Sequence, residues 1–342
     1  MSKNHLQLFF KKVQKKINLD EKIFLAGANG MVGNSIYRTL IKKGYGNKIN
    51  GGEIYSPNRK ELDLFDVNLV KKWFEKHKPS VVIIAAAKVG GILANSKYPT
   101  EFLLENLKIQ TNIIETSWRF GVKRLIFLGS SCIYPKLAQQ PIKEKYLLQG
   151  ELETTNQWYA IAKITGIKMC EALRKQYGFD AISLMPTNLY GPKDNYHPQN
   201  SHVMAALIRK FYEASLKKLP RVTCWGSGSP YREFLHVDDL SDAILYILEN
   251  FDSENDQNVE EDLSLINIGT GKDISIKELA EKIASLTEYK GEIYWDRSKP
   301  DGTKKKQLDI SRIRKLGWEA KIGLEEGILK TIESFKKEHY AI

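Results

Sequence analysis

The feature that most restricts the fold of this chain is an apolar strand that runs directly into a glycine-rich turn and then into a helix. The stretch KIFLAGA, from Lys22, leads into Gly27-Ala-Asn-Gly30-Met-Val-Gly33 and then NSIYRTLIKKG. Glycines in such a turn allow the backbone to turn tightly and to approach a pyrophosphate, and they allow the helix to pack closely on the strand. The helix N-terminus attracts phosphate. The pattern predicts a dinucleotide-binding βα unit. Its candidate cofactor-binding residues are Gly27, Ala28, Asn29, Gly30, Met31, Val32 and Gly33.

The rest of the chain extends this unit into a larger α/β pattern. Apolar runs of strand length lie near 22–28, 53–56, 81–87, 124–130 and 180–187, separated by longer helical stretches. Such alternation predicts a doubly wound parallel Rossmann sheet. After Arg221 the pattern becomes mixed, which indicates a smaller, mixed α/β substrate-binding lobe. We expect a basic N-terminal extension over 1–20, a Rossmann domain over 21–185 plus about 219–250, and the second lobe over 186–218 plus about 251–342.

Composition excludes several other classes of protein. The apolar runs are far shorter than the ~20 residues of a membrane span, so we expect no membrane insertion. Three cysteines, Cys132, Cys170 and Cys224, are too few for a disulfide framework and match no zinc spacing, which favours a reducing cytoplasm and no metal. The net charge of +11 comes mostly from scattered lysines without an arginine-rich stripe. It therefore suits an enzyme with a polyanionic substrate better than a nucleic-acid-binding protein.

The second strand bears on the choice between NAD and NADP. A carboxylate at the end of this strand binds the ribose hydroxyls of NAD, whereas an arginine there accepts the 2′-phosphate of NADP. Here the stretch reads Ile54-Tyr-Ser-Pro-Asn-Arg59, and Glu53 lies too early. Arg59 therefore favours NADP(H) as cofactor.

A tyrosine and a lysine four residues apart, Tyr159 and Lys163, lie on one face of the helix that follows Asn156. A nearby ammonium is expected to lower the pKa of the phenol, which would make Tyr159 a proton donor and acceptor near neutral pH. The strand in RLIFLGSSCIYP places Ser130 and Ser131 at its carboxyl end, where parallel sheets bind ligands. Together these elements predict a Ser-Tyr-Lys carbonyl-reductase site.

Several longer motifs, spread over the chain from Lys22 onward, carry a specific resemblance to one family. They are GANGMVG, AAAKVGGILAN, ENLKIQTNIIE, LGSSCIYPK, YAIAK, PTNLYGP, HPQNSHV, WGSGSPYREFLHVDD and PDGTKKKQLD. With these, and with GxxGxxG spacing in its turn, the chain resembles the GDP-L-fucose synthases, which are extended short-chain dehydrogenases/reductases. The resemblance implies NADPH-dependent 3,5-epimerisation and 4-reduction of GDP-4-keto-6-deoxy-D-mannose by a homodimer. A related GDP-keto-deoxysugar reductase, of colitose or modified-heptose type, and a non-catalytic NADP-sensing regulator stay open as alternatives.

The resemblance also implies roles for the catalytic residues. Ser130 would hydrogen-bond the substrate C4 oxygen, Tyr159 would protonate it, and Lys163 would bind the nicotinamide ribose and polarise Tyr159. Cys132 and His202 would be the acid and base of the epimerisation. A thiol serves as such a base once a neighbouring cation or helix terminus lowers its pKa.

Further binding residues follow from the same resemblance. Two positions depart from its pattern: Asn29 stands where some relatives carry an arginine, and Lys210 stands where an arginine is expected. The helices over 100–120 and 156–177 would form the dimer interface. The implied substrate-binding residues are Lys210, Trp225, Arg232, Asp301 and Lys306. The further implied cofactor-binding residues are Asp63, Leu64, Ala86, Leu128, Gly129, Ser131, Lys163, Pro186, Thr187, Asn188, Leu189 and His202.

Overall fold

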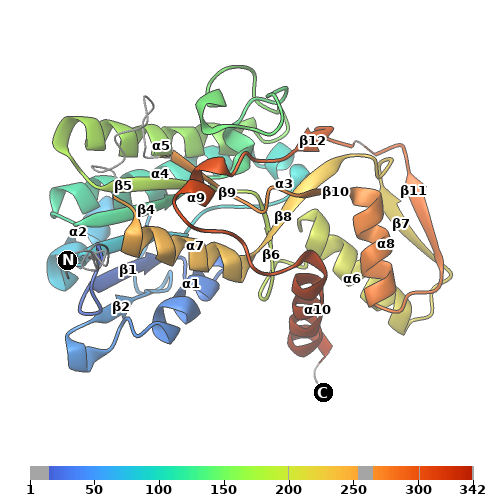
Figure 1. The fold of residues 1–342 in the computed structure, drawn as a ribbon, viewed down its shortest axis with the longest axis horizontal. Helices are drawn as coiled ribbons and strands as arrows, with labels where there is room; N and C mark the ends of the chain where they lie inside the picture. The colour runs from blue at the N-terminus through green and yellow to red at the C-terminus, as the bar shows by residue number, and fades with distance from the viewer. Residues whose placement is uncertain (1–14, 199, 253–264, 300, 341–342) are drawn as a thin grey trace, which may run out of the picture.

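The computed structural model describes residues 15–198, 200–252, 265–299 and 301–340. Within these residues the chain forms two lobes that lie side by side, a larger one around a parallel sheet and a smaller one that carries the C-terminus (Figure 1). Most of the expected basic extension, residues 1–14, lies outside the described residues.

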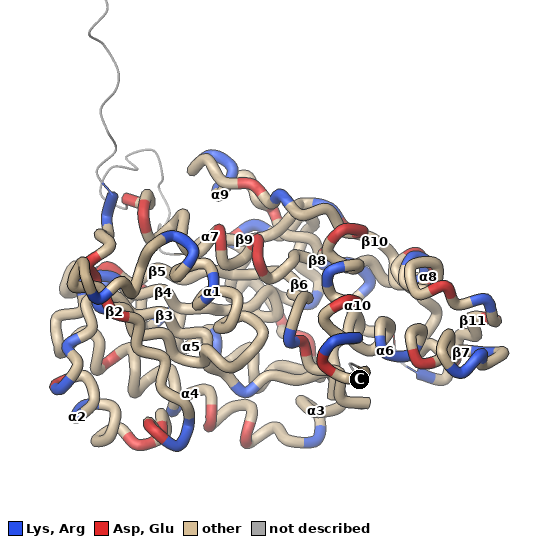
Figure 2. The backbone as a smooth tube through the Cα atoms, turned by 90° about the horizontal axis from the view of Figure 1, so that it is seen from below, with Lys and Arg blue, Asp and Glu red and all other residues tan. Residues whose placement is uncertain are grey.

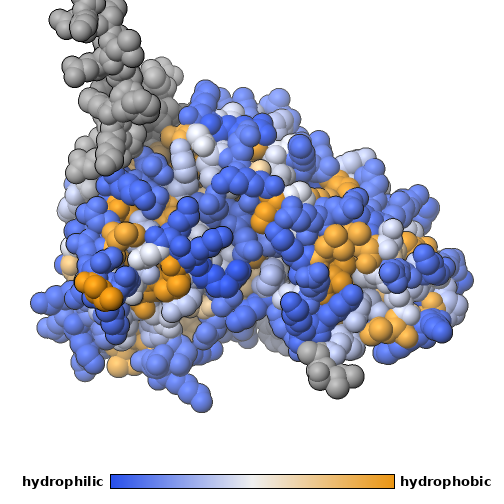
Figure 3. Space-filling view, turned by 60° about the horizontal axis from the view of Figure 1, so that its bottom comes forward, coloured by the Kyte–Doolittle hydropathy of each residue, from blue (hydrophilic) through white to orange (hydrophobic). Residues whose placement is uncertain are grey.

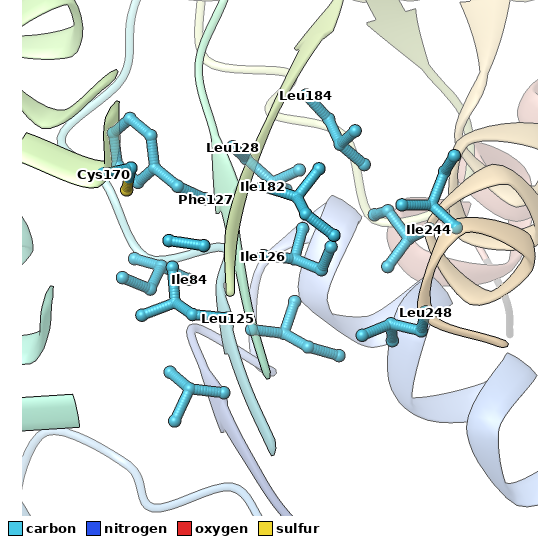
Figure 4. Close-up of a cluster of buried hydrophobic side chains, with 14 of the residues drawn as sticks. Ile84, Leu125, Ile126, Phe127, Leu128, Cys170, Ile182, Leu184, Ile244 and Leu248 are labelled. Atoms are coloured by element: carbon cyan, nitrogen blue, oxygen red, sulfur yellow. The ribbon is translucent and has the colours of Figure 1, made fainter. Parts of the chain in front are cut away.

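A six-stranded sheet forms the centre of the larger lobe, in the order β2-β1-β3-β4-β5-β9, and every neighbouring pair is parallel. This confirms the predicted doubly wound α/β fold. The four central strands β1, β3, β4 and β5 are almost entirely buried because helices cover both faces of the sheet. Figure 4 shows part of this core, where Ile126 and Ile182 from adjacent strands lie close to Ile244 of a covering helix. The strands are β1 (Lys22–Ala26), β2 (Glu53–Tyr55), β3 (Val81–Ile84), β4 (Arg124–Leu128), β5 (Ala181–Pro186) and β9 (Leu265–Ile268).

Helices pack on both faces of this sheet. α1 packs against α7 on one face, and α4 packs against α2 and, most extensively, α5 on the other (Figure 1). Short elements at the sheet edge and in the connections are α3 (Ile92–Lys97), α9 (Ser311–Lys315) and the 3₁₀ turns η1 (Lys48–Asn50), η2 (Ser131–Ile133) and η3 (Glu144–Tyr146). The long helices are α1 (Met31–Lys42), α2 (Val67–His77), α4 (Pro99–Arg119), α5 (Gln157–Tyr177) and α7 (Val237–Asn250).

The smaller lobe is mixed, as predicted, with two small sheets and three helices around its own core. In one sheet β8 lies between β10 and β12 and also pairs with β6, and in the other β7 pairs with β11. The strands are β6 (Asn188–Tyr190), β7 (Arg221–Trp225), β8 (Tyr231–His236), β10 (Asp273–Ser275), β11 (Glu292–Asp296) and β12 (Lys305–Lys306). The helices are α6 (Val203–Leu216), α8 (Ile276–Leu286) and α10 (Leu324–Tyr340).

The chain crosses between the lobes more often than the expected boundaries allow. Of the range 219–250, expected in the Rossmann domain, β7 and most of β8 pair within the smaller lobe, and only α7 covers the large sheet. Of the range 251–342, expected in the smaller lobe, β9 pairs with β5, and Leu308, Ile313 and Trp318 join the larger core. We propose a division by packing, in which α7, β9 and about 308–318 belong to the Rossmann domain.

The surface carries charges of both signs. Lysine and arginine alternate with aspartate and glutamate over both lobes (Figure 2), and on the face shown in Figure 3 apolar residues form separate patches among polar ones. Among the described residues, none of the helices is both long and apolar enough to span a membrane.

Candidate active site

The glycine turn between β1 and α1 is shaped to receive a dinucleotide phosphate. Gly27 has φ +90°, and a Cβ there would lie 2.7 Å from the backbone nitrogen of Ala86, so only glycine fits. A Cβ on Gly33 would collide with the carbonyl oxygen of Gly27, which shows how closely α1 packs on the turn. Gly30 caps α1 without a side-chain hydrogen bond, which leaves the first amides of the helix available to an anion. These residues fit the dinucleotide that the sequence predicts.

This turn opens into a cavity of about 710 Å³ along the carboxyl ends of the central strands. A mainly apolar wall with a few polar groups is typical of a cofactor site. Every residue that the sequence analysis assigns to cofactor binding lines this cavity: Gly27, Ala28, Asn29, Gly30, Met31, Val32, Gly33, Arg59, Asp63, Leu64, Ala86, Leu128, Gly129, Ser131, Lys163, Pro186, Thr187, Asn188, Leu189 and His202.

Arg59 is exposed at the cavity rim, with its guanidinium 4.9 Å from the centre of the Phe65 ring. Asn29 lies in the same cavity wall. Contact with an aromatic ring fixes the orientation of a guanidinium without occupying its N–H donors. The N–H groups of Arg59 therefore stay available to a phosphate.

Lys163 and Tyr159 project from the first turns of α5 into the cavity wall. The Lys163 ammonium is buried, donates to the Leu128 carbonyl oxygen at 2.8 Å and lies 5.8 Å from the centre of the Tyr159 ring. Burial lowers the pKa of Lys163 to about 8. The expected lowering of the Tyr159 pKa is not found: burial raises it, and the thiol of Cys132 adds to the rise. Desolvation of the phenolate is the largest cause of this rise.

Cys132 lies in η2, directly after the carboxyl end of β4. Ser130 caps this turn, and its Oγ accepts a hydrogen bond from the Cys132 amide at 3.4 Å. The thiol is buried, with 8% of the residue exposed, and burial raises its pKa above the ordinary value, while Lys306, Ser130 and Lys163 act in the opposite direction. The cations expected near the thiol are present, but they do not overcome its desolvation. Ser130, Tyr159, Lys163 and His202 line the cavity, and the Cys132 thiol lies close enough to Tyr159 and Lys163 to affect the pKa of both.

His202 reaches the cavity from the opposite lobe, as the residue that caps the N-terminus of α6. Its side chain makes no capping hydrogen bond, and the residue is exposed at the cavity, while desolvation by the groups around it lowers its imidazole pKa, which favours the neutral form at pH 7. The loop before it is tied to the Rossmann lobe, because the Gly91 amide donates to the Asn200 carbonyl oxygen at 3.2 Å. His202 can thus reach a ligand held against the large sheet.

The five expected substrate-binding residues lie in the smaller lobe and outside the cavity wall. The Lys210 ammonium lies 5.7 Å from the centre of the half-exposed Trp225 ring and donates to the Thr223 carbonyl oxygen at 2.9 Å. The Asp301 carboxylate accepts from the Ser227 amide at 2.6 Å and from the Ser227 hydroxyl at 2.8 Å. These contacts hold the Trp225–Ser227 segment at the edge of the two-stranded sheet.

Arg232 and Lys306 lie next to each other on the paired strands β8 and β12. Burial lowers the pKa of both groups, and the charge of Asp301 raises that of Arg232. Lys306 also lies close enough to Cys132 for each group to affect the pKa of the other. Arg232, Lys306 and the Cys132 thiol therefore belong to one cluster of interacting groups.

The sequence analysis missed other residues of the cavity wall. The loop from Lys88 to Gly90 follows β3 and is held by Asn106, whose side chain bonds both the amide and the carbonyl oxygen of Lys88. Two successive glycines after a buried strand are the signal that could have indicated this close approach. Asp194 also lines the cavity, and burial raises its pKa to about 7. It is not part of any sequence motif that indicates a site.

Comparison with known proteins shows the family of this chain. A sequence model described as the NAD dependent epimerase/dehydratase family matches residues 23–269. The chain belongs to this family.

Among members of the NAD dependent epimerase/dehydratase family, the GDP-L-fucose synthase of Escherichia coli strain K12 is 50% identical over 92% of this chain and 96% of its own length. The crystal structure of a GDP-6-OMe-4-keto-L-xylo-heptose reductase from C. jejuni has a TM-score of 0.87 at 35% identity and covers 94% of this chain and 99% of that chain. MlghC, a GDP-mannoheptose C4 reductase from Campylobacter jejuni with NADP bound, has a TM-score of 0.84 at 37% identity and covers 94% and 99%.

Proposed function

We propose that this protein converts GDP-4-keto-6-deoxy-D-mannose to GDP-L-fucose by NADPH-dependent 3,5-epimerisation and 4-reduction. The observation that carries the proposal is the convergence of Ser130, Tyr159, Lys163 and His202 on one cavity that begins at the glycine turn. The 50% identity to a GDP-L-fucose synthase over nearly the whole chain supports the same substrate.

The cofactor is NADP, as in the related C4 reductase whose structure contains it. We assign its pyrophosphate to the glycine turn and its 2′-phosphate to Arg59, since an arginine offers paired donors to phosphate oxygens. When bound, NADPH supplies the hydride for the reduction. Lys163 holds the nicotinamide ribose.

The reduction requires a proton at the substrate C4 oxygen. Burial keeps Tyr159 in the phenol form, so the residue has a proton to donate as negative charge develops on that oxygen. Ser130 adds a second hydrogen-bond donor and orients the carbonyl group.

The epimerisation requires, at C3 and at C5 in turn, removal of a proton from one face by a base and delivery of another proton to the opposite face by an acid. The C4 ketone acidifies both protons, so a thiolate at Cys132 suffices as base. His202, which comes from the other lobe, is placed to serve as the acid, a role that requires its protonated imidazolium form. Since its pKa is lowered, this form is the minor one at pH 7. Lys306 stabilises the thiolate by its charge.

The direct test is to incubate the purified protein with NADPH and GDP-4-keto-6-deoxy-D-mannose and to identify the product by NMR. We expect GDP-L-fucose. A 4-reduced product with the original C3 and C5 configuration would remove the epimerase activity from the proposal, and no NADPH oxidation would refute it.

A GDP-keto-heptose C4 reductase is the second candidate function. The heptose reductase with a TM-score of 0.87 supports it. A heptose carries one more carbon than a 6-deoxyhexose, so comparing kcat/KM for the two GDP-4-keto sugars separates the candidates.

Two further properties belong to the proposal. We infer a homodimer formed through α4 and α5, which pack together extensively and carry exposed apolar side chains such as Leu104 and Ile161. A cytoplasmic location is supported by the free thiols of Cys132, Cys170 and Cys224.

A further inference from the structure

Glu233 is a fully buried glutamate in the middle of β8, and backbone amides from two distant segments converge on its carboxylate. One oxygen accepts from the amides of Thr270 at 2.6 Å and Gly271 at 2.8 Å, and the other accepts from the Leu308 amide at 2.7 Å. The side chain has no exposed surface. The carboxylate thus joins β8 to the turn after β9 and to the segment after β12.

This arrangement is unusual in its charge balance. Among the residues that the structure describes, neither lysine nor arginine forms an ion pair with Glu233, so the buried carboxyl group is stabilised by the three backbone amides, with the Thr270 hydroxyl at 3.4 Å as a further donor. A Cβ on Gly269 would collide with the carboxylate, so the turn fits closely around it. Burying a charge in this way is costly, and the three donors need to be held in place to compensate for it.

The segments that Glu233 joins carry the cations proposed to bind substrate. Arg232 precedes it in β8 and points to the opposite side of the strand, and Lys306 pairs with Arg232 two residues before Leu308. Lys306 in turn acts on the Cys132 thiol. The bond between Glu233 and Leu308, together with the pairing of β12 with β8, therefore sets the position of Lys306 relative to Arg232.

The main chain of Glu233 meets the cofactor cavity instead. Its carbonyl oxygen accepts from Thr187 Oγ1 at 3.2 Å and from Asn188 Nδ2 at 2.7 Å, and both residues line that cavity. A substitution of the side chain leaves these two bonds unchanged. Changes at the carboxylate should therefore affect the substrate cations and spare the cofactor.

We propose that Glu233 is a positioning residue for the diphosphate of the substrate: its carboxylate fixes β8 against β12 so that Arg232 and Lys306 face the same phosphate group. The proposal rests on the proposed function, because it assumes a GDP-linked substrate. It assigns no contact between Glu233 and the substrate.

The test uses Glu233→Gln, which keeps the size of the side chain but turns an amide NH₂ toward backbone donors. The matched control is Asp239→Asn. Asp239 is also buried and also accepts backbone amides, from Lys321 and Ile322, but it joins α7 to the segment before α10 and does not join β8 to β12. Glu233→Asp is a second variant, which keeps the charge and withdraws the carboxylate by one methylene group.

Binding of GDP and of NADPH is measured separately by titration calorimetry for each protein. We expect Glu233→Gln to weaken GDP binding by about tenfold or more, the size of one lost charged hydrogen bond, with NADPH affinity within about twofold of wild type. Glu233→Asp should give a smaller loss, and Asp239→Asn should leave GDP affinity unchanged. In turnover, Glu233→Gln should raise KM for the GDP-sugar more than it lowers kcat.

The outcomes separate the two proposals. If wild-type protein does not bind GDP, the proposed function fails, whatever Glu233 does. If wild type and Glu233→Gln bind GDP equally well, the positioning role is wrong. It is also wrong if both Glu233→Gln and Glu233→Asp lose GDP affinity and NADPH affinity together. Retained NADPH binding in either variant serves as the check that the Rossmann lobe is folded.

Discussion

At the scale of single residues, burial controls the protonation of the two acidic groups beside Ser130. The Tyr159 phenol and the Cys132 thiol both have raised pKa values because desolvation penalises their anions. Both groups are therefore protonated at neutral pH. For Tyr159 this is the form that its proposed role as proton donor needs, whereas Cys132 has to lose its proton before it can act as the proposed base.

Tyr159→Phe should abolish NADPH oxidation and leave NADPH affinity nearly intact. The phenol proton is required only as charge develops on the substrate oxygen, so the loss should fall on kcat by at least ~10²-fold. Stopped-flow absorbance at the nicotinamide band measures the turnover, and fluorescence titration measures binding. Turnover in the variant equal to that of wild type would exclude Tyr159 as the proton donor.

Cys132→Ser should stop solvent deuterium uptake at C3 and C5 while reduction continues, because a serine hydroxyl is far less acidic than a thiol. In wild type the uptake should rise with pH and still be rising above about pH 8.5, the ordinary thiol value, since the thiol pKa is raised and the thiolate forms only as pH increases. NMR of the substrate in deuterated buffer measures both effects. Uptake in Cys132→Ser at the wild-type rate would make Cys132 a structural residue.

At the scale of secondary structure, the sequence patterns predicted the local units well. The strands β1 to β5 lie where buried apolar runs alternate with helices, and the glycine turn has the shape that its spacing requires. The sequence did not reveal that β9 joins the large sheet, because a single apolar run does not specify its partner strand. It also could not reveal the surroundings of Cys132, since Lys306 is brought to the thiol by the pairing of β12 with β8.

Gly33→Ala tests the glycine turn as a structural unit. The added methyl group would collide with the Gly27 carbonyl oxygen, so α1 should be displaced from β1 at a cost of ~1–3 kcal/mol or more in unfolding free energy, with loss of NADPH binding. Gly323→Ala is the matched control, because a Cβ at Gly323 meets no atom within 4 Å. Thermal unfolding and NADPH titration compare the two variants, and equal behaviour would mean that the turn tolerates a side chain.

At the scale of the whole molecule, the cleft and the proposed dimer surface lie in different places. The cofactor cavity runs along the carboxyl ends of the strands, whereas α4 and α5 cover one face of the sheet (Figure 1). Lys163 and Tyr159 nevertheless belong to α5, so a partner packed on that helix would help to fix these two side chains. We therefore expect assembly to stabilise the site without contributing residues to the cofactor cavity.

Leu104→Glu should convert the proposed homodimer into a monomer. Leu104 lies on α4 with 48% of its surface exposed. In the proposed dimer a carboxylate at this position would be buried against the partner subunit without a compensating charge, which is unfavourable. Leu219→Glu is the matched control, because Leu219 is 43% exposed but lies in the smaller lobe. Light scattering at micromolar concentration should give twice the 39.1 kDa chain mass for wild type and the control, and the single chain mass for Leu104→Glu. A monomeric wild type would refute the dimer, and a dimeric Leu104→Glu would move the interface away from α4.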